Sequence, residues 1–532
     1  MKRLALAVLS LMLVVGFSAV AYAGPGSVVI KTDGDITARF GSQVRFVPTY
    51  EKNWDFGIKE KSGNAAFLPH TMEFGTVSNG YIRSEDRLYF NFAKGDIWDV
   101  YFALEFDDAV QSRTADRIRQ TQGDESSFGV ERLNASVKLP WIWSRLNAGW
   151  DVYAVDLDAG SIVYGDDDPG FSIQGGVANF DWKFGYHKKI EVNRRVTSAD
   201  RVAANNITNT GYDNDRDVYS ARVNFTLFKD TKFGLIYAFN DQKVRGNVAT
   251  NDVCGLLGPA PANNTCQNVN ANFISPIVTA SIAGFKIAAQ FSHSFGDAER
   301  MLVAGDKFDI SSNAAFADVA YDMTPLVGLR LIPHVGVLWA QGDDNPSDNK
   351  LEGYSSITSL HQFLPSFGGE NTFLAGGNAV VGTTVYSFLP DQRGNQNAAL
   401  GTGGIGGTGR GDNPGLLLIG GGITVDPIKN WSLRSNVYYL RYNEDFCLTS
   451  PAGACAATSS GAPNRITERD IGVEWDNEVS WWLDKNMVIK GQFSFLFPGD
   501  GTRQITRALA NIPGVQPDET AIRLAMELLW NF

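Results

Sequence analysis

Alternation of apolar and polar residues with a period of two is the feature that most constrains the fold of this 532-residue chain. The pattern recurs from residue 36 to residue 532 and is interrupted by turns and by long polar connections. Such alternation indicates strands with one face in apolar surroundings, and no helical periodicity is sustained. Beyond residue 23 we find no run of about eighteen apolar residues, which a membrane-spanning helix requires. The sequence therefore predicts an all-β chain.

The alternating segments group in pairs, with a short turn inside each pair and a long polar loop between pairs. They predict strands over residues 36–49, 81–92, 98–106, 130–139, 145–155, 171–178, 181–190, 218–227, 232–240, 272–282, 285–294, 308–321, 328–340, 416–425, 431–442, 469–481, 487–497 and 520–532.

These segments predict a single transmembrane antiparallel barrel, spanning residues 24–532, of about eighteen strands, an even number as bacterial barrels require. Residues 171–190 leave little room for two strands, so sixteen is the alternative. Short turns are expected on the periplasmic side and long loops outside the cell. A barrel of this size encloses an aqueous channel unless loops fill it. Residues 341–414 are the best candidate for a loop that narrows the channel.

The first residues predict a cleaved signal peptide over residues 1–23. Lys2 and Arg3 precede an apolar run, and small residues stand at Ala21 and Ala23, the positions that a signal peptidase reads. A retained membrane anchor is the alternative. Export and a barrel together predict the outer membrane of a Gram-negative bacterium, in contact with lipid and lipopolysaccharide.

The last segment also favours a barrel. Apolar residues occupy alternate positions over 522–532 and end at Phe532. An exposed apolar edge aggregates in a soluble sheet, whereas a closed barrel has no edge and places that face in lipid. Phe532 is similar to the terminal aromatic residue that the bacterial barrel-assembly machinery reads, so we expect it to act as an assembly signal.

Alternation also assigns charged side chains to the interior. A cation facing lipid at the membrane midplane costs about 2–4 kcal/mol, and a carboxylate somewhat less. Further cations and acids share this parity, among them Lys138, Lys183, Asp99, Glu105 and Glu527. The principal predicted pore-lining residues are Arg39, Arg45, Arg83, Glu85, Arg87, Arg132, Arg145, Arg222, Arg330, Arg434, Asp470, Glu474, Asp476, Glu478, Lys490 and Arg523.

Two interpretations of this lining remain open. Arg39, Arg45, Arg83, Arg87 and Arg523 fall on neighbouring strands, and acids are expected mainly in loops and on the opposite wall, so the arginines would attract anionic solutes. Alternatively, the charges only pair with one another and hydrate the lumen. A third arrangement is a polar lumen plugged by loops.

Cys254, Cys266, Cys447 and Cys455 form two pairs, each within one loop-like segment. In an oxidising envelope compartment they predict the disulfides Cys254–Cys266 and Cys447–Cys455. Zinc is disfavoured, because the spacing is unsuitable and no histidine lies beside them. No cofactor is expected.

The formal net charge of −12 disfavours a nucleic-acid partner. Acidic clusters fall in predicted loops, and no catalytic motif indicates an enzyme. Asp213, Asp215 and Asp217 imitate the start of a calcium loop, but Val218 stands where an EF-hand needs glycine. A surface calcium site stays open. The other acidic clusters are Asp166, Asp167 and Asp168, and Asp343 with Asp344.

Residues 468–476, the turn at 483–486 and residues 495–500 resemble the C-terminal hairpin of the alginate-export family. This resemblance implies a cleaved signal, about eighteen strands and a charged lumen. It also suggests export of an anionic polysaccharide through an arginine-rich constriction. Three hypotheses follow: a porin-like channel for passive diffusion of hydrophilic, chiefly anionic solutes; a polysaccharide export pore with periplasmic partners; or a plugged barrel acting as adhesin, receptor or structural protein.

Overall fold

The structure is a computed structural model that describes residues 28–31, 35–62, 78–110, 129–190, 216–228, 230–243, 266–300, 307–345, 348, 350–358, 374–375, 413–447, 465–510 and 514–532. The predicted signal peptide, Asp213 and Asp215, Cys254 and Cys455 lie outside these residues. The signal peptide and the disulfides therefore stay predictions.

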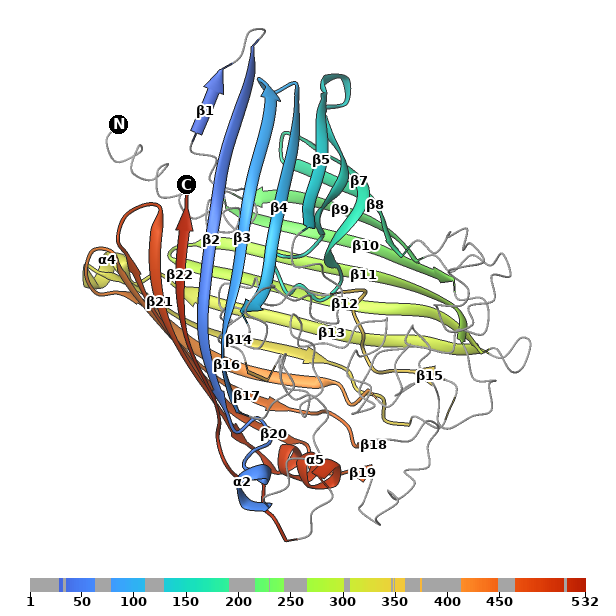
Figure 1. Cartoon of the computed structure of the whole chain (residues 1–532). Coiled ribbons are helices and arrows are strands. Elements are labelled where there is room, and N and C mark those ends of the chain that lie inside the picture. The colour runs from blue at the N-terminus through green and yellow to red at the C-terminus, as the bar shows by residue number, and fades with distance from the viewer. Residues whose placement is uncertain are drawn as a thin grey trace, which may run out of the picture.

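Eighteen long antiparallel strands form one sheet that closes on itself as a barrel (Figure 1). They are β2 (Ile36–Lys52), β3 (Asn79–Lys94), β4 (Trp98–Val110), β5 (Gly129–Leu139), β6 (Ser144–Ala154), β7 (Gly165–Val177), β8 (Phe180–Ile190), β9 (Arg216–Phe228), β10 (Thr231–Lys243), β11 (Cys266–Ile282), β12 (Phe285–Arg300), β13 (Lys307–Tyr321), β14 (Arg330–Ala340), β16 (Leu416–Asp426), β17 (Trp431–Arg441), β20 (Asp470–Trp482), β21 (Met487–Pro498) and β22 (Ala521–Asn531).

The barrel closes where β2 pairs with β22 on one side and with β3 on the other. At the end of β22, the backbone N–H of Ser42 donates to the carbonyl of Phe532 at 2.7 Å, and the N–H of Phe532 donates back at 2.9 Å. A short strand, β1 (Val28–Lys31), continues along the same edge of β2. Closure gives the backbone N–H and C=O groups of the edge strands hydrogen-bond partners, which lipid cannot supply.

The outer face of the barrel exposes large apolar side chains from most of its strands. A soluble monomer rarely exposes so large an apolar surface, whereas lipid covers it. The protein is therefore a Gram-negative outer-membrane barrel that crosses the membrane with its strands. The exposed residues include Val44, Leu88, Trp150, Phe184, Tyr219, Phe291, Val335, Trp475, Phe493 and Trp530.

All eighteen predicted strands are confirmed, and the alternative of a sixteen-stranded barrel is excluded. Several strands extend beyond their predicted bounds. The most consequential difference is that β7 begins at Gly165 rather than at residue 171, so the acidic run at 166–168 lies in a strand and not in a loop. Its charge is compensated inside the barrel, because the ammonium of Lys189 pairs with Asp166 and lies 3.3 Å from Asp168. Asp217 likewise belongs to β9 rather than to a loop.

Two connections at the long-loop end fold into the barrel. Residues 155–164 and 350–358 place buried apolar side chains against the inner faces of β10–β14 and β16. We call this covered inner surface the packed wall. The inward course predicted for residues 341–414 is confirmed for their described part, whereas that of residues 155–164 was not predicted. The cluster includes Ile162, Tyr164, Tyr354 and Ile357 from the loops, and Ile236, Phe273, Phe316, Leu338 and Leu418 from the strands.

Short helices and strands lie at the two ends of the barrel. At the long-loop end lie α2 (Ile58–Ser62), α5 (Asp500–Ala510), β15 (Lys350–Leu351) and the small hairpin of β18 (Phe446–Cys447) and β19 (Arg465–Ile466), while the short turns carry η1 (Pro140–Ile142) and α4 (Thr324–Val327) (Figure 1). The predicted absence of helix was wrong at α5, whose Ile505 is buried and whose Thr502 hydroxyl donates to the carbonyl of Ile471 at 2.7 Å. No described helix is long and apolar enough to cross a membrane.

Candidate functional site

Charged side chains line a second inner surface, made by β20, β21, β22, β2, β3, β4 and β5, which we call the charged wall. In β2 alternate residues point inward, so Arg39, Arg45 and Glu51 share one face along most of the strand. Arg39 is exposed near the short turns, whereas Glu51 is buried near the long loops. Charged side chains are therefore present on this wall from the short-turn end of the barrel to the long-loop end.

Arg87 is the most heavily paired cation of the charged wall. Its guanidinium lies 2.6 Å from Glu85, 2.8 Å from Glu131 and in contact with Glu105. These carboxylates come from β3, β4 and β5, because antiparallel pairing sets Arg87 directly opposite Glu105. A planar fork of N–H donors can serve several carboxylates at once.

Arg45 and Arg83 lie on either side of the same network. Arg45 pairs with Glu85 and lies 3.3 Å from Glu527 on β22. Arg83 holds Asp107 with two hydrogen bonds, at 2.8 and 2.6 Å, which is the strong bidentate geometry. Each arginine is therefore matched by a carboxylate on a neighbouring strand.

Arg523 lies at the long-loop end rather than beside Arg39. It is in register with Glu51, to which its Nε donates at 2.6 Å, and its guanidinium lies over the ring of Trp54 at 5.2 Å. The predicted neighbour relation between the first and last strands is confirmed, but the predicted single cluster of arginines is wrong. The pairing register spreads these cations along the barrel.

A bulge places two adjacent charged residues of β5 inside the barrel. The pairing register shifts between Ala103 and Leu104 of β4. As a result, the side chains of both Glu131 and Arg132 lie on the inner face of the barrel. Arg132 is 5% exposed and lies 3.0 Å from Glu131 and 3.4 Å from Asp151. Alternation alone would have turned one of the two toward lipid.

Five further predicted cations are paired as well. Arg145 contacts Asp99, Arg222 grips Asp158 at 2.6 and 2.7 Å, Arg330 lies 3.1 Å from Asp426, Arg434 lies 3.2 Å from Glu478, and Lys490 lies 2.9 Å from Glu527.

The acidic strand β20 only partly matches its prediction. Glu474 is fully buried, and its carboxylate accepts the backbone N–H groups of Leu374 and Ala375, the latter at 2.9 Å. Asp476 is 2% exposed, so neither acid faces open lumen. Asp470 lies on the outer face of the barrel. The register shift near Gly472 sets it opposite Arg441, so the alternation of inward and outward residues changes phase there. Its predicted pore-lining position was wrong.

The expected separation of charges was also wrong. Glu51, Glu85, Glu105, Glu131 and Glu527 lie between the arginines of the charged wall rather than in loops or on an opposite wall. At such distances each of these paired cations is neutralised locally, since screening in solution extends only about 8 Å. The described wall therefore combines both signs along its length.

Asp156 organises the inward loop at residues 155–164. Its Oδ2 accepts hydrogen bonds of 2.8 Å from the backbone N–H groups of Ile162 and Val163 and from the side-chain amide of Gln290. The group is fully buried, and burial raises the pKa of the Asp156 carboxyl to about 6. Gln290 also accepts the N–H of Gly160 at 2.7 Å, so this loop is bound to β12.

Tyr354 joins the two inward loops to each other. Its hydroxyl donates to the carbonyl of Ile162 at 2.7 Å and lies 2.9 Å from the hydroxyl of Ser292. The fully buried Arg216 donates to Asn240 at 2.8 Å and to the carbonyl of Ile357 at 2.9 Å. The sequence analysis missed these groups, although the apolar run at 162–164 inside a polar connection could have indicated a buried loop.

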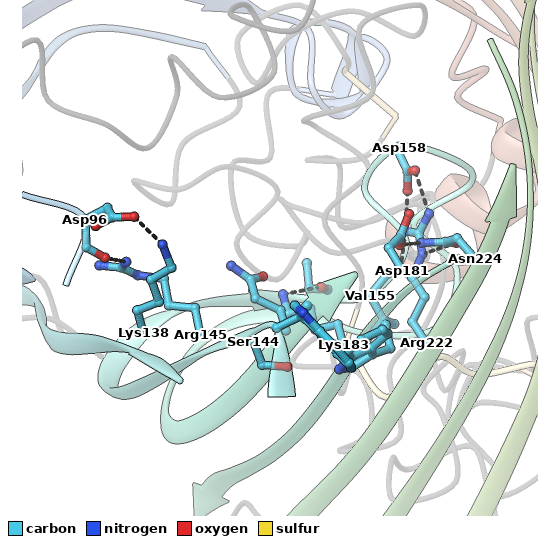
Figure 2. Close-up of a pocket in the computed structure, with 15 residues that line it drawn as sticks. Asp96, Lys138, Ser144, Arg145, Val155, Asp158, Asp181, Lys183, Arg222 and Asn224 are labelled. Atoms are coloured by element: carbon cyan, nitrogen blue, oxygen red, sulfur yellow. Dashed lines mark hydrogen bonds and ion pairs between the residues drawn. The ribbon is translucent and has the colours of Figure 1, made fainter. Parts of the chain in front are cut away.

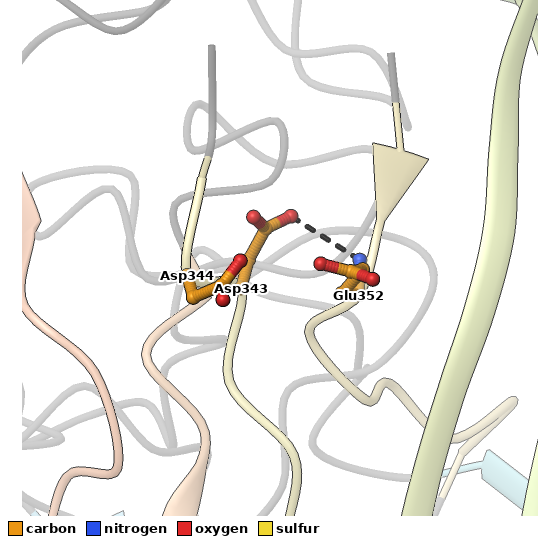
Figure 3. A group of neighbouring side chains, drawn as sticks. All are labelled: Asp343, Asp344 and Glu352. Carbon is orange, nitrogen blue, oxygen red and sulfur yellow. Dashed lines mark hydrogen bonds between the residues drawn. The ribbon is translucent and has the colours of Figure 1, made fainter. Parts of the chain in front are cut away.

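Three carboxylates of the inward segment lie close together (Figure 3). Oxygen atoms of Asp343, Asp344 and Glu352 lie within 4.8 Å of one another. The Asp343 carboxylate accepts the backbone N–H groups of Asn345 at 3.1 Å and Glu352 at 3.2 Å, and burial raises its pKa to about 7. Its oxygens already bind the turn that they stabilise, so we assign no cation to this group.

Comparison with known proteins gives structural similarities at low identity. No family model and no curated protein matches the chain. Solved structures similar to it include a BenF-like porin from Pseudomonas fluorescens (11% identity, TM-score 0.44, covering 93% of this chain and 99% of that one). OpdK from Pseudomonas aeruginosa with vanillate has 9% identity and a TM-score of 0.45, over 93% and 98% of the two chains. Wzi of Escherichia coli, a carbohydrate-binding barrel, has 10% identity and a TM-score of 0.44, over 92% and 84%. Membership of the alginate-export family stays a prediction from residues 468–501.

Proposed function

We propose that the protein is a porin-like channel for passive diffusion of small hydrophilic solutes across the outer membrane. The observation that supports this most strongly is the charged wall, which runs from Arg39 near the short turns to Glu51 and Arg523 near the long loops. A lumen that excluded water would leave such groups without hydration, at high cost. Barrels of this strand number enclose a channel unless a plug fills it.

The inward loops narrow this channel from one side. They cover the packed wall with apolar side chains, and the solute path we propose follows the charged wall opposite. Since both signs of charge are interleaved there, we do not extend the proposal to export of an anionic polysaccharide: carboxylates stand between the arginines that would hold the polymer.

Conductance of the purified protein in a planar lipid bilayer tests the proposal. We expect discrete, stepwise current increases in potassium chloride that are carried by inserted single channels. A correctly folded barrel that inserts without any conductance would overturn the channel and support a plugged barrel with a receptor or structural role.

A further inference from the structure

A cavity of about 780 Å³ opens on the inner face of β5–β9, at the short-turn end of the barrel (Figure 2). Val155 and Asp158, at the start of the inward loop, contribute to its lining. Its size lies within the range of small-molecule sites, about 300–1,000 Å³. Figure 2 shows Lys183 between one group formed by Lys138 and Arg145 and another formed by Arg222 and Asp158.

Three of the four cations that line this cavity are neutralised. Lys138 pairs with Asp96, and Arg145 with Asp99. Arg222 forms the bidentate pair with Asp158 described above. Two of the acids that line the cavity, Asp96 and Asp158, are engaged by these same contacts.

One further acid, Asp181, also has partners. Its carboxylate accepts the side-chain amide of Asn224 and lies 3.7 Å from the ammonium of Lys232. Among the described lining residues, every carboxylate therefore has a cationic or amide partner.

Lys183 differs from the other cations. Its ammonium donates to the backbone carbonyl of Ala154 at 3.1 Å, and no described carboxylate lies within ion-pairing distance of it. An ammonium carries three donors, so two remain for other acceptors. The cavity thus holds one ammonium that contacts no described carboxylate, while Asp151 and Asp158 act on it only from a longer distance.

We propose that this cavity binds a small hydroxy acid of charge −1, with the ligand carboxylate on the Lys183 ammonium. A single cation with no carboxylate in contact matches one ligand carboxylate, and Asp158 and Asp181 disfavour a more highly charged anion. Gln174 and Asp181 line the same cavity and offer partners to ligand hydroxyl groups. The inference rests on the proposed function, because the solute reaches the cavity through the channel.

Calorimetric titration of the detergent-solubilised barrel with D-gluconate tests this site without requiring conduction. Gluconate should bind saturably, while neutral D-sorbitol should not. Lys183→Gln should weaken gluconate binding about tenfold or more, because a charge-assisted hydrogen bond is lost, and Lys183→Arg should retain most of the affinity. The matched control is Lys307→Gln, which removes an equal charge at an exposed lysine that pairs with Asp297 at 2.9 Å, outside the cavity.

The outcomes separate the site from the channel. Equal weakening by Lys183→Gln and Lys307→Gln would show only a general charge effect and overturn the site. Absence of gluconate binding to a wild-type barrel that still conducts would also overturn it, while leaving the channel standing. Heat-dependent gel mobility verifies that each variant is a folded barrel.

Discussion

The packed wall and the charged wall are built from the same alternating strands, yet they differ in what covers them. On the packed wall, inward residues such as Phe273 and Leu338 are buried under loop residues such as Ile162 and Tyr354. On the charged wall, inward residues pair with carboxylates of neighbouring strands. Alternation therefore decides whether a residue faces inward or outward. Whether an inward surface becomes an apolar core or a polar path depends on whether loops cover it.

The largest effect on stability is expected from removing Arg87, the most heavily paired cation of the charged wall. Arg87→Met leaves Glu85, Glu105 and Glu131 close together without their shared partner, and we expect a loss of about 3–5 kcal/mol in the free energy of unfolding. Arg330→Met is the control, because Arg330 and its partner Asp426 are exposed and such a pair contributes about 0–1 kcal/mol. Urea unfolding of the two variants in lipid vesicles measures the difference; equal losses would contradict the central role of Arg87.

A smaller effect is expected from loosening the inward loop on the packed wall. A Cβ atom at Gly160 would lie 2.6 Å from Cβ of Phe316 and 2.9 Å from Oε1 of Gln290. Gly160→Val should therefore cost about 1–3 kcal/mol of loop packing and raise single-channel conductance. Gly80→Val in β3 is the control for conductance, since a Cβ there lies no closer than 3.8 Å to other groups and the backbone is not in the left-handed region. Unchanged conductance of the Gly160 variant would show that this loop does not narrow the path.

These two walls were not equally predictable from the sequence. The alternation located all eighteen strands and the inward side of Arg45, Arg83 and Arg87, because a charge in lipid is costly. It did not identify Glu131 as an inward residue and it wrongly placed Asp470 inside, since the inserted residues at the two bulges change the faces without leaving a mark in the sequence. Partner identity also escaped prediction, because pairing register and loop course depend on contacts between distant segments.

Acidity should affect the packed wall through Asp156. Its pKa in the packed loop is raised above the usual value, so ionisation opposes packing at pH values above about 6, and packing strengthens as the pH falls toward 4. Burial outweighs the hydrogen bonds from Gln290, Val163 and Ile162 and the positive charge of Arg222, all of which favour the ionised form of Asp156. We expect modestly lower conductance at pH 5 than at pH 7.5, measured in bilayers, and a smaller difference in Asp156→Asn. A larger conductance at pH 5 would contradict this sign.

The reversal potential under a potassium chloride gradient tests most directly that the solute path follows the charged wall. Arg83→Gln should shift it toward cation preference, and Asp107→Asn, which removes the partner charge, toward anion preference. Asp318→Asn, on the packed wall where Asp318 is 6% exposed and bonded to His334 at 2.9 Å, should leave it nearly unchanged. A shift from Asp318→Asn as large as those from Arg83→Gln and Asp107→Asn, or no response to the latter two, would contradict the account.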